Sequence, residues 1–151
     1  MKEIGALGEQ LVGQWLKTQD YELLHQGWYC RWGEIDLIVQ DKYTQTLAFV
    51  EVKTRSQSNW DENGLLAVNL PKQQKIFTTA SLFLAKYPHL AELPCRFDVA
   101  LVSYQVCQSQ LGNSGLNIAQ TKVIKIGQSV VLSDRYQLTL RDYLQSAFEG
   151  F

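Results

Sequence analysis

The sequence predicts an α/β fold in which a mixed β-sheet carries helices on its faces. One observation behind this is the order of the elements, because three consecutive strands follow the first predicted helix. That order argues against a fold that alternates strictly between strands and helices. The other observation is size and composition. The 151 residues, 46% hydrophobic and 19% charged, are typical of one domain with a real core, spanning residues 1–151.

The first third of the chain predicts one helix and three strands. Residues 3–19 repeat apolar side chains at helical spacing, and residues 21–31, 33–40 and 47–55 read as strands, with Gly27 interrupting the first of them. The short polar segment between the second and third strands predicts a hairpin. The apolar positions of the helix are Ile4, Leu7, Leu11, Val12, Trp15 and Leu16.

The middle of the chain predicts a loop, a helix and a strand. Residues 56–64 are polar and read as a loop. A helix is expected over residues 71–86, because proline suits a first helical turn and the Tyr-Pro pair that follows stops the helix. Residues 97–102 then form a predicted strand.

The last third is predicted to hold a loop, two strands and a final helix. Residues 105–117 are rich in Gly, Asn and Ser and read as an exposed loop, and residues 118–126 and 129–132 read as strands. Thr139 is expected to cap a last helix. The apolar side of that helix would be Leu140, Tyr143, Leu144 and Phe148.

Composition excludes some classes of protein. The net charge of −1 is not that of a non-specific nucleic-acid-coating protein, so any nucleic-acid contact must come from a local basic patch. No apolar stretch reaches the ~18 residues of a membrane span, and the N-terminus lacks a signal-peptide core. Three cysteines without CxxC spacing indicate reduced thiols and a cytoplasmic protein, and their spacing does not support a zinc site.

Carboxylates stand inside two of the predicted strands, where a burial cost must be offset by pairing or by a metal. On the strand over residues 47–55, Glu51 and Lys53 share a face, and Asp36 lies on the preceding strand. Antiparallel pairing of the two strands can place Asp36 beside Glu51, with Cβ atoms ~5 Å apart. Two carboxylates so placed repel by ~3–4 kcal/mol at an effective dielectric constant of 20.

Oxygen ligands of this kind suit Mg²⁺ or Mn²⁺. Phosphodiester hydrolysis assisted by a metal uses such a set, with a lysine such as Lys53 to orient the water or hold developing negative charge. The alternative is a structural ion pair on a solvated sheet face, and the two interpretations stand close to even. Glu9 on the first helix is a further candidate, because Gly5 and Gly13 flank it one turn away on either side. The spacing alone favours an ordinary exposed glutamate at this position.

A local basic patch and nearby aromatic residues could contact nucleic acid. Ordinary surface charge explains any single one of these basic residues as well. The aromatic residues around Arg31 could stack on unpaired bases, although aromatic residues more often pack a core edge. Asp98, two residues after Arg96, is best explained by a structural salt bridge. The basic residues are Arg31, Arg55, Lys72, Lys75 and Arg96, and the aromatic residues are Trp28, Tyr29 and Trp32.

Several segments together resemble the YraN family of bacterial proteins over nearly the whole chain. The two most specific are Gly-Glu-Ile-Asp-Leu-Ile at 33–38 and Phe-Val-Glu-Val-Lys-Thr-Arg at 49–55. The others are Gly8-Glu9, Ala67-Val68 followed by Lys72, Arg96-Phe97-Asp98-Val99 and Ala147-Phe148.

That family is similar to the restriction-endonuclease-like nucleases, nearest to the archaeal Holliday junction resolvases. The resemblance implies a central mixed sheet flanked by helices and a Mg²⁺-dependent nuclease site. Such enzymes carry a helix acid, a strand acid and a Glu-x-Lys pair, which match Glu9, Asp36, and Glu51 with Lys53. It also implies DNA rather than RNA as the partner, and a homodimer, as for the resolvases.

Two further hypotheses remain beside a metal-dependent endonuclease acting on branched or single-stranded DNA. One is a non-catalytic nucleic-acid-binding module that keeps the fold. The other is a structural or partner-binding protein in which the acids form a charged network with Lys53 and Arg55. The low net charge mildly favours the structural or partner-binding protein over the nucleic-acid-binding module, and the complete acid set favours the enzyme over both.

Overall fold

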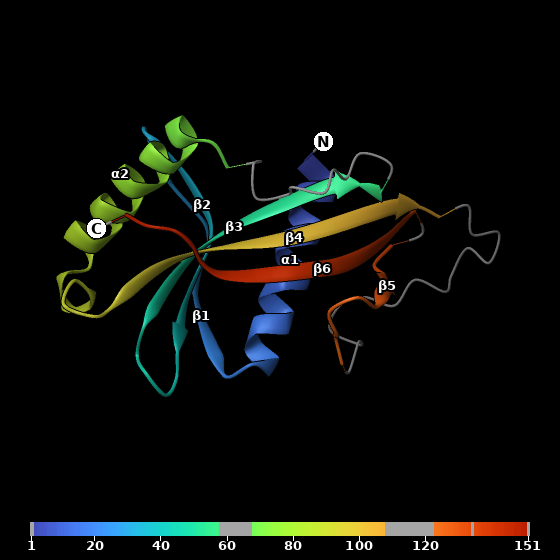
Figure 1. Cartoon of the computed structure of the whole chain (residues 1–151), viewed down its shortest axis with the longest axis horizontal. Helices are drawn as coiled ribbons and strands as arrows, with labels where there is room; N and C mark the ends of the chain where they lie inside the picture. Colours follow the sequence, from blue (N-terminus) through green and yellow to red (C-terminus); the bar gives the residue numbers. More distant parts are fainter. Residues whose placement is uncertain (1, 58–67, 108–122, 134, 151) are drawn as a thin grey trace.

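A six-stranded mixed sheet with one helix against each face forms the core of the protein, which confirms the predicted class and is consistent with a restriction-endonuclease-like fold (Figure 1). The computed structural model describes residues 2–57, 68–107, 123–133 and 135–150. In chain order the elements are α1 (Lys2–Thr18), β1 (Tyr21–Cys30), β2 (Gly33–Asp41), β3 (Leu47–Ser56), α2 (Leu70–Lys86), the short 3₁₀ helix η3 (Pro88–Leu90), β4 (Cys95–Val106), β5 (Ser129–Val131) and β6 (Tyr136–Phe148).

The sheet has the strand order β1-β2-β3-β4-β6-β5. Strands β1, β2 and β3 form an antiparallel meander that includes the predicted hairpin of β2 and β3, and β4, β6 and β5 pair antiparallel on the other side. The pair β3–β4 is parallel, because the chain leaves β3, passes through α2 and returns to begin β4 beside the start of β3. The connection thus brings α2 back over the sheet next to β3.

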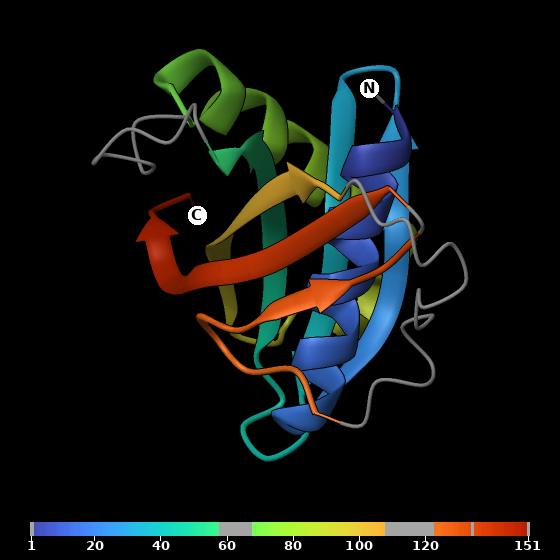
Figure 2. The ribbon, with the colours of Figure 1, turned by 90° about the vertical axis from the view of Figure 1, so that its right-hand side faces the viewer.

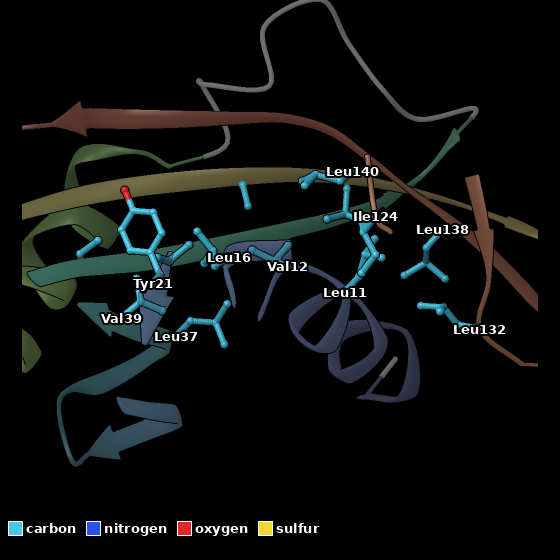
Figure 3. Close-up of a cluster of buried hydrophobic side chains, with 14 of the residues drawn as sticks. Leu11, Val12, Leu16, Tyr21, Leu37, Val39, Ile124, Leu132, Leu138 and Leu140 are labelled. Atoms are coloured by element: carbon cyan, nitrogen blue, oxygen red, sulfur yellow. The ribbon is translucent and has the colours of Figure 1, made fainter. Parts of the chain in front are cut away.

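Each helix covers one face of the sheet and builds its own hydrophobic cluster (Figure 2). Helix α1 buries Leu11, Val12 and Leu16 against Leu37 and Val50 in a cluster that extends to β6 (Figure 3). On the other face, α2 buries its own apolar side against β2, β3 and β4. The core residues of that second cluster are Ile35, Ile38, Leu47, Phe49, Val68, Ile76, Ala80, Phe83, Phe97 and Val99.

Helix α2 begins and ends as the sequence predicts. Asn69 caps it, since its side-chain oxygen accepts a hydrogen bond from the Lys72 backbone N–H at 3.0 Å, and Pro71 stands in the first turn. Tyr87 closes the helix, with its own N–H donating to the Phe83 carbonyl, and Pro88 begins η3. Local chemistry therefore fixes where α2 begins and ends.

The predicted final helix is wrong, because Tyr136–Phe148 is the strand β6. Thr139 caps no helix there, and its hydroxyl lies 2.8 Å from that of Ser129 on β5. Two register shifts against β4 and the positive φ of Ser146 break the two-residue alternation, so the apolar positions fall at spacings that resemble a helix. Pairing with β4 and β5 decides the outcome.

Of the other predictions for the C-terminal half, some are confirmed and one is wrong. Strand β5 confirms the strand expected at 129–132, and β4 extends the strand expected at 97–102 in both directions. Residues 123–126 are not a strand, and the rest of the segment 118–126 lies outside the described residues. Most of the loops expected at 56–64 and 105–117 lie outside the described residues as well. Within the described ranges, no helix combines the length and apolar character that crossing a membrane requires.

Candidate functional site

The candidate site lies where β2 and β3 separate. Their ladder ends at the pair Leu37–Val50, so the next position in register sets Asp36 opposite Glu51, as the alternation of the strands predicts. Instead of a backbone partner, the Val52 N–H finds the carboxylate of Asp36 and donates to Oδ2 at 2.7 Å. The Asp36 side chain thus stands in for a missing strand contact and is held beside Glu51.

A local irregularity in β1 accompanies this separation. The pairing of β1 with β2 passes from Gln26–Leu37 to Trp28–Ile35 and skips the position between them, where Gly27 faces Asp36. Gly27 has a φ of 69°, which a glycine adopts without strain. On either side of Asp36, Leu37 packs in the α1 cluster and Ile35 in the α2 cluster. Residues two apart on a regular strand point to the same face of the sheet, so the alternation of β2 is broken at Asp36.

Two lysines share one oxygen of Glu51. The Glu51 side chain is buried, with 6% of the residue exposed, and its Oε1 lies 2.6 Å from Lys72 Nζ and 3.7 Å from Lys53 Nζ. Burial and the charge of Lys72 lower the pKa of Lys53. Burial also acts to lower the pKa of Lys72, but the hydrogen bond and charge of Glu51 outweigh it and the pKa is raised. Lys72, predicted to contact phosphate, is an ion-pair partner of Glu51 in this structure.

Helix α1 brings Glu9 into the same cleft by a close approach to β3. A Cβ atom on Gly8 would lie 2.1 Å from Oγ1 of Thr54, so only glycine permits this contact. Gly5 and Gly13, which flank Glu9 one turn away, do not make such a contact, because a Cβ on Gly5 would meet nothing within 4 Å and one on Gly13 would make ordinary contacts. The glycine adjacent to Glu9 has that role.

Glu9 and Asp36 are poorly compensated acids. Burial, followed by the charges of Glu34 and Glu51, raises the pKa of Glu9 to about 7. Burial and then the charge of Glu51 raise the pKa of Asp36 to about 8, against the opposing effect of the Val52 N–H. Both carboxyl groups thus favour their protonated forms near neutral pH, because burial and the neighbouring acids outweigh the lowering effect of the Lys72 charge on Asp36.

Glu34 completes the group, and it was not among the predicted site residues. One carboxylate oxygen from each of Glu9, Glu34 and Asp36 lies within 4.8 Å of the others, close enough to share one metal ion. The signal was present in the sequence, since Glu34 is two residues before Asp36, a spacing that predicts a shared strand face. Carboxylate oxygens in such a group are the ligands that Mg²⁺ and Mn²⁺ prefer.

Two hollows meet at this group of acids. The first, of about 550 Å³, lies between α1 and β3. The second, of about 580 Å³, lies between β2 and the start of α2. Asp36, Glu51 and Lys72 line both hollows, whereas Glu9 lines only the first and Glu34 only the second. Asp36 and Glu51 therefore lie where the two hollows join. The first hollow is lined by Ile4, Gly5, Glu9, Asp36, residues 51–56, Lys72 and Tyr104, and the second by Gly33, Glu34, Asp36, Glu51, Asn69, Pro71, Lys72, Lys75 and Ile76.

The remaining basic candidates divide into two groups. Arg55 lines the first hollow and Lys75 the second, while Arg31 is exposed at the β1–β2 turn with its guanidinium 4.5 Å from the centre of the Trp32 ring. Arg96 lies elsewhere: its Nε donates to both oxygens of Asp98 at 3.1 Å. The predicted salt bridge is confirmed, and Arg96 is removed from the basic patch.

Comparison with known proteins shows the family to which the chain belongs. Residues 8–102, which include Glu9, Asp36, Glu51 and Lys53, match the model of the uncharacterised protein family UPF0102. A UPF0102 protein of Acaryochloris marina is 46% identical over 97% of this chain and 90% of its own length. A UPF0102 protein of Trichormus variabilis is 46% identical over 97% of this chain and 94% of its own, and one of Synechocystis sp. is 45% identical over 99% and 100%. The chain therefore belongs to the UPF0102 family, which is the YraN family that the sequence motifs resemble.

Proposed function

We propose that this protein is a Mg²⁺- or Mn²⁺-dependent endonuclease that hydrolyses phosphodiester bonds in branched or single-stranded DNA. The observation that carries the proposal is the convergence of Glu9, Asp36 and Glu51 on one cleft from three different elements. Burial and the charges of neighbouring acids raise the pKa of Glu9 and of Asp36, and a divalent cation is the partner that would offset the charge of these acids. A purely structural network would be expected to supply enough cations of its own.

The residues present fit such a cation. Asp36 and Glu51 would hold it, and Glu9 would support it or its water, with Glu34 within reach as a further oxygen ligand. When bound, a divalent cation supplies Lewis-acid stabilisation of the phosphate and a water of lowered pKa. Mg²⁺ and Mn²⁺ suit these ligands because both prefer carboxylate oxygens.

The chain's own basic groups would act on the phosphate. Lys53, half-buried beside Glu51 with a lowered pKa, can orient the attacking water or hold the negative charge that develops on the phosphate. Arg55 and Lys75 line the two hollows on either side of the acids and would contact flanking phosphates, with Arg31 farther out at the β1–β2 turn. These contacts would fix the position of the strand without reading its sequence.

One observation favours a second candidate function. The Lys72 ammonium lies 2.6 Å from Glu51, which is where a cation would otherwise be expected. In a non-catalytic nucleic-acid-binding module, or a structural protein that keeps the fold, this ion pair would be permanent. The raised pKa of Glu9 and Asp36 argues for the enzyme, because burial and the neighbouring acids outweigh the lowering effect of the Lys72 charge on Asp36.

A cleavage assay tests the enzymatic proposal. The protein is incubated with labelled branched, flapped, single-stranded and duplex DNA in Mg²⁺ or Mn²⁺, with RNA strands of the same sequence for comparison. We expect cleavage of branched or single-stranded DNA that falls at least about 100-fold in Glu51→Ala and Lys53→Ala. Glu92→Ala and Lys42→Ala change exposed residues outside the cleft and should keep activity. No cleavage of any of these substrates with either metal would refute the proposal. Sedimentation of the same preparation tests the homodimer that the resemblance implies.

A further inference from the structure

Two large aromatic side chains are exposed at the end of the β1–β2 hairpin. Tyr29 is 75% exposed and lies on β1 just before the turn, and Trp32 is 50% exposed and is the second residue of the two-residue turn that Cys30 and Gly33 close. Their neighbour Trp28 behaves differently, because its ring packs edge-on against Phe83 at 5.3 Å in the α2 core. The core therefore accounts for Trp28 and leaves Tyr29 and Trp32 to be explained.

This hairpin end stands beside the group of acids. Tyr29 is paired with Glu34 across the two strands, which puts both side chains on the same face with Cβ atoms about 5 Å apart. The carboxylate of Glu34 is in turn within 4.8 Å of those of Glu9 and Asp36. Gly33 at the base of the turn lines the same hollow as Asp36, so the hollow leads from the turn to the acids.

The hairpin end is held firmly against α2. Cys30 Sγ lies 3.7 Å from the hydroxyl of the buried Thr79 and accepts a hydrogen bond from the Trp32 N–H at 3.4 Å. A Cβ on Gly33 would lie 3.0 Å from the same Thr79 hydroxyl, so the backbone of the turn sits directly on the helix. Aromatic rings presented from a fixed backbone lose little freedom when a partner stacks on them.

The chemistry of this surface fits an unpaired nucleotide. Flat aromatic rings accept the face of any base, and that face is exposed only when the base has left a duplex stack. Arg31, with its guanidinium 4.5 Å from the centre of the Trp32 ring, adds a cation for the phosphate or a further stacking plane. Lys75 lies beside the turn, its Cβ 3.7 Å from the position a Gly33 Cβ would take.

We infer that Tyr29 and Trp32 form a stacking site for an unpaired base next to the phosphodiester that the acids act on. The inference rests on the proposed nuclease function, because that function defines where the base lies relative to the scissile bond. On this inference, the protein selects substrates that have unpaired nucleotides on the hairpin side of the scissile bond. A fully paired duplex would reach the acids without this contact and would bind more weakly.

The test compares binding of two labelled DNA probes by fluorescence anisotropy in the absence of divalent metal, so that nothing is cleaved. One probe is a blunt duplex, and the other is the same duplex with a single-stranded extension. The variants are Tyr29→Ala, Trp32→Ala and the double variant. The matched control is Tyr43→Ala, which removes an equally exposed tyrosine (81%) in the β2–β3 turn, at the opposite end of β2 from the acids.

We expect each hairpin variant to weaken binding of the extended probe about 5- to 100-fold, the usual effect of losing one base-stacking side chain, and to change duplex binding less than about twofold. Tyr43→Ala should bind both probes like the wild type. Equal losses on the two probes, an equal loss in the control, or no binding of the extended probe by the wild type would each overturn the inference. So would a wild-type dimer that the hairpin variants dissociate, because the rings would then serve a protein interface.

The outcome is separable from that of the proposed function. If the wild type cleaves DNA with Mn²⁺ and the hairpin variants bind the extended probe as tightly as the wild type does, the stacking site alone is refuted. If the hairpin variants lose affinity for the extended probe only, and the wild type neither cleaves DNA nor binds Mn²⁺, the stacking site is supported and the nuclease function is refuted. Because both side chains are exposed, the variants should unfold at the wild-type temperature, which confirms that a change in binding is not a change in folding.

Discussion

Two aspartates, Asp98 and the half-buried Asp36, show how the surroundings of a residue separate a structural acid from a candidate ligand. Asp98 is fully buried and satisfied, because it accepts hydrogen bonds from Arg96, from the Tyr143 hydroxyl at 2.6 Å and from the Ser146 N–H at 3.0 Å. Asp36 accepts one backbone N–H, from Val52, and the raising effect of burial and of the charges of Glu51 and Glu9 exceeds the lowering effect of that N–H and of the Lys72 charge. The spacing of Arg96 and Asp98 predicted the structural role of Asp98, and in the structure the hydrogen-bond partners of the two carboxylates distinguish them.

The pH dependence of stability follows from Glu9 and Asp36. Their pKa values are raised in the folded state to about 7 and about 8, from 4.5 and 3.8, so the folded protein binds more protons than the unfolded chain between these limits. The stability that these protons contribute is present below about pH 4 and is lost as the pH rises through about 8. We expect urea unfolding to show the metal-free protein losing stability from pH 5 to pH 9.

The isosteric variant Asp36→Asn is the control for that titration. It has no proton to lose, so its free energy of unfolding should fall less over the same pH range than that of the wild type. Mn²⁺ should restore wild-type stability more at pH 8 than at pH 6, because protons compete with the metal for the same oxygens. Parallel pH profiles for the two proteins would contradict this account of Asp36.

Lys72 is expected to compete with a cation for Glu51. Its ammonium lies 2.6 Å from Oε1, so Lys72→Met should make Mn²⁺ bind more tightly, by about tenfold, while lowering any cleavage activity. Calorimetric titration measures the first effect. Lys86→Met, which changes an exposed lysine in the last turn of the same helix, should leave the affinity unchanged. A weaker affinity in Lys72→Met would show that Lys72 supports the site instead.

At the scale of elements, the close contact between α1 and β3 decides whether Glu9 reaches the cleft. Gly8→Ala would drive a methyl group to 2.1 Å from the Thr54 hydroxyl, so we expect a loss of about 1–3 kcal/mol in the free energy of unfolding and weaker Mn²⁺ binding.

Gly5→Ala, on the same helix, is the matched control. Its added methyl group would meet nothing within 4 Å, so the better helix former should leave stability unchanged or raise it by up to about 1 kcal/mol. If the two variants behaved alike in urea unfolding, the close approach at Gly8 would not be what positions α1.

The elements that could be predicted from the sequence are those with strong local signals. Helix α1 has a clear apolar stripe, α2 has Asn69 and Pro71 at its start, and the strands β2 and β3 are apolar runs on either side of a polar turn. Strand β6 could not be predicted, because its bulges remove the alternation and only its pairing with β4 and β5 identifies it.

At the scale of the whole molecule, the sheet explains why the site could be predicted in part. The antiparallel pairing of β2 and β3 follows from the short turn between them, and it sets Asp36 opposite Glu51. The position of Lys72 depends on how α2 docks on the sheet after the parallel crossover, which no local pattern encodes. The same is true of Glu9, whose reach depends on the contact between Gly8 and Thr54.

The central claim is that Glu9, Asp36 and Glu51 form a site for a divalent cation. Calorimetric titration of the metal-free protein with Mn²⁺ at pH 8, beside Asp36→Asn, tests it most directly. The account predicts saturable binding to the wild type that is lost in Asp36→Asn, with an affinity that falls when the titration is repeated at pH 6. Absence of saturable binding to the wild type, or equal binding to both proteins, would contradict it.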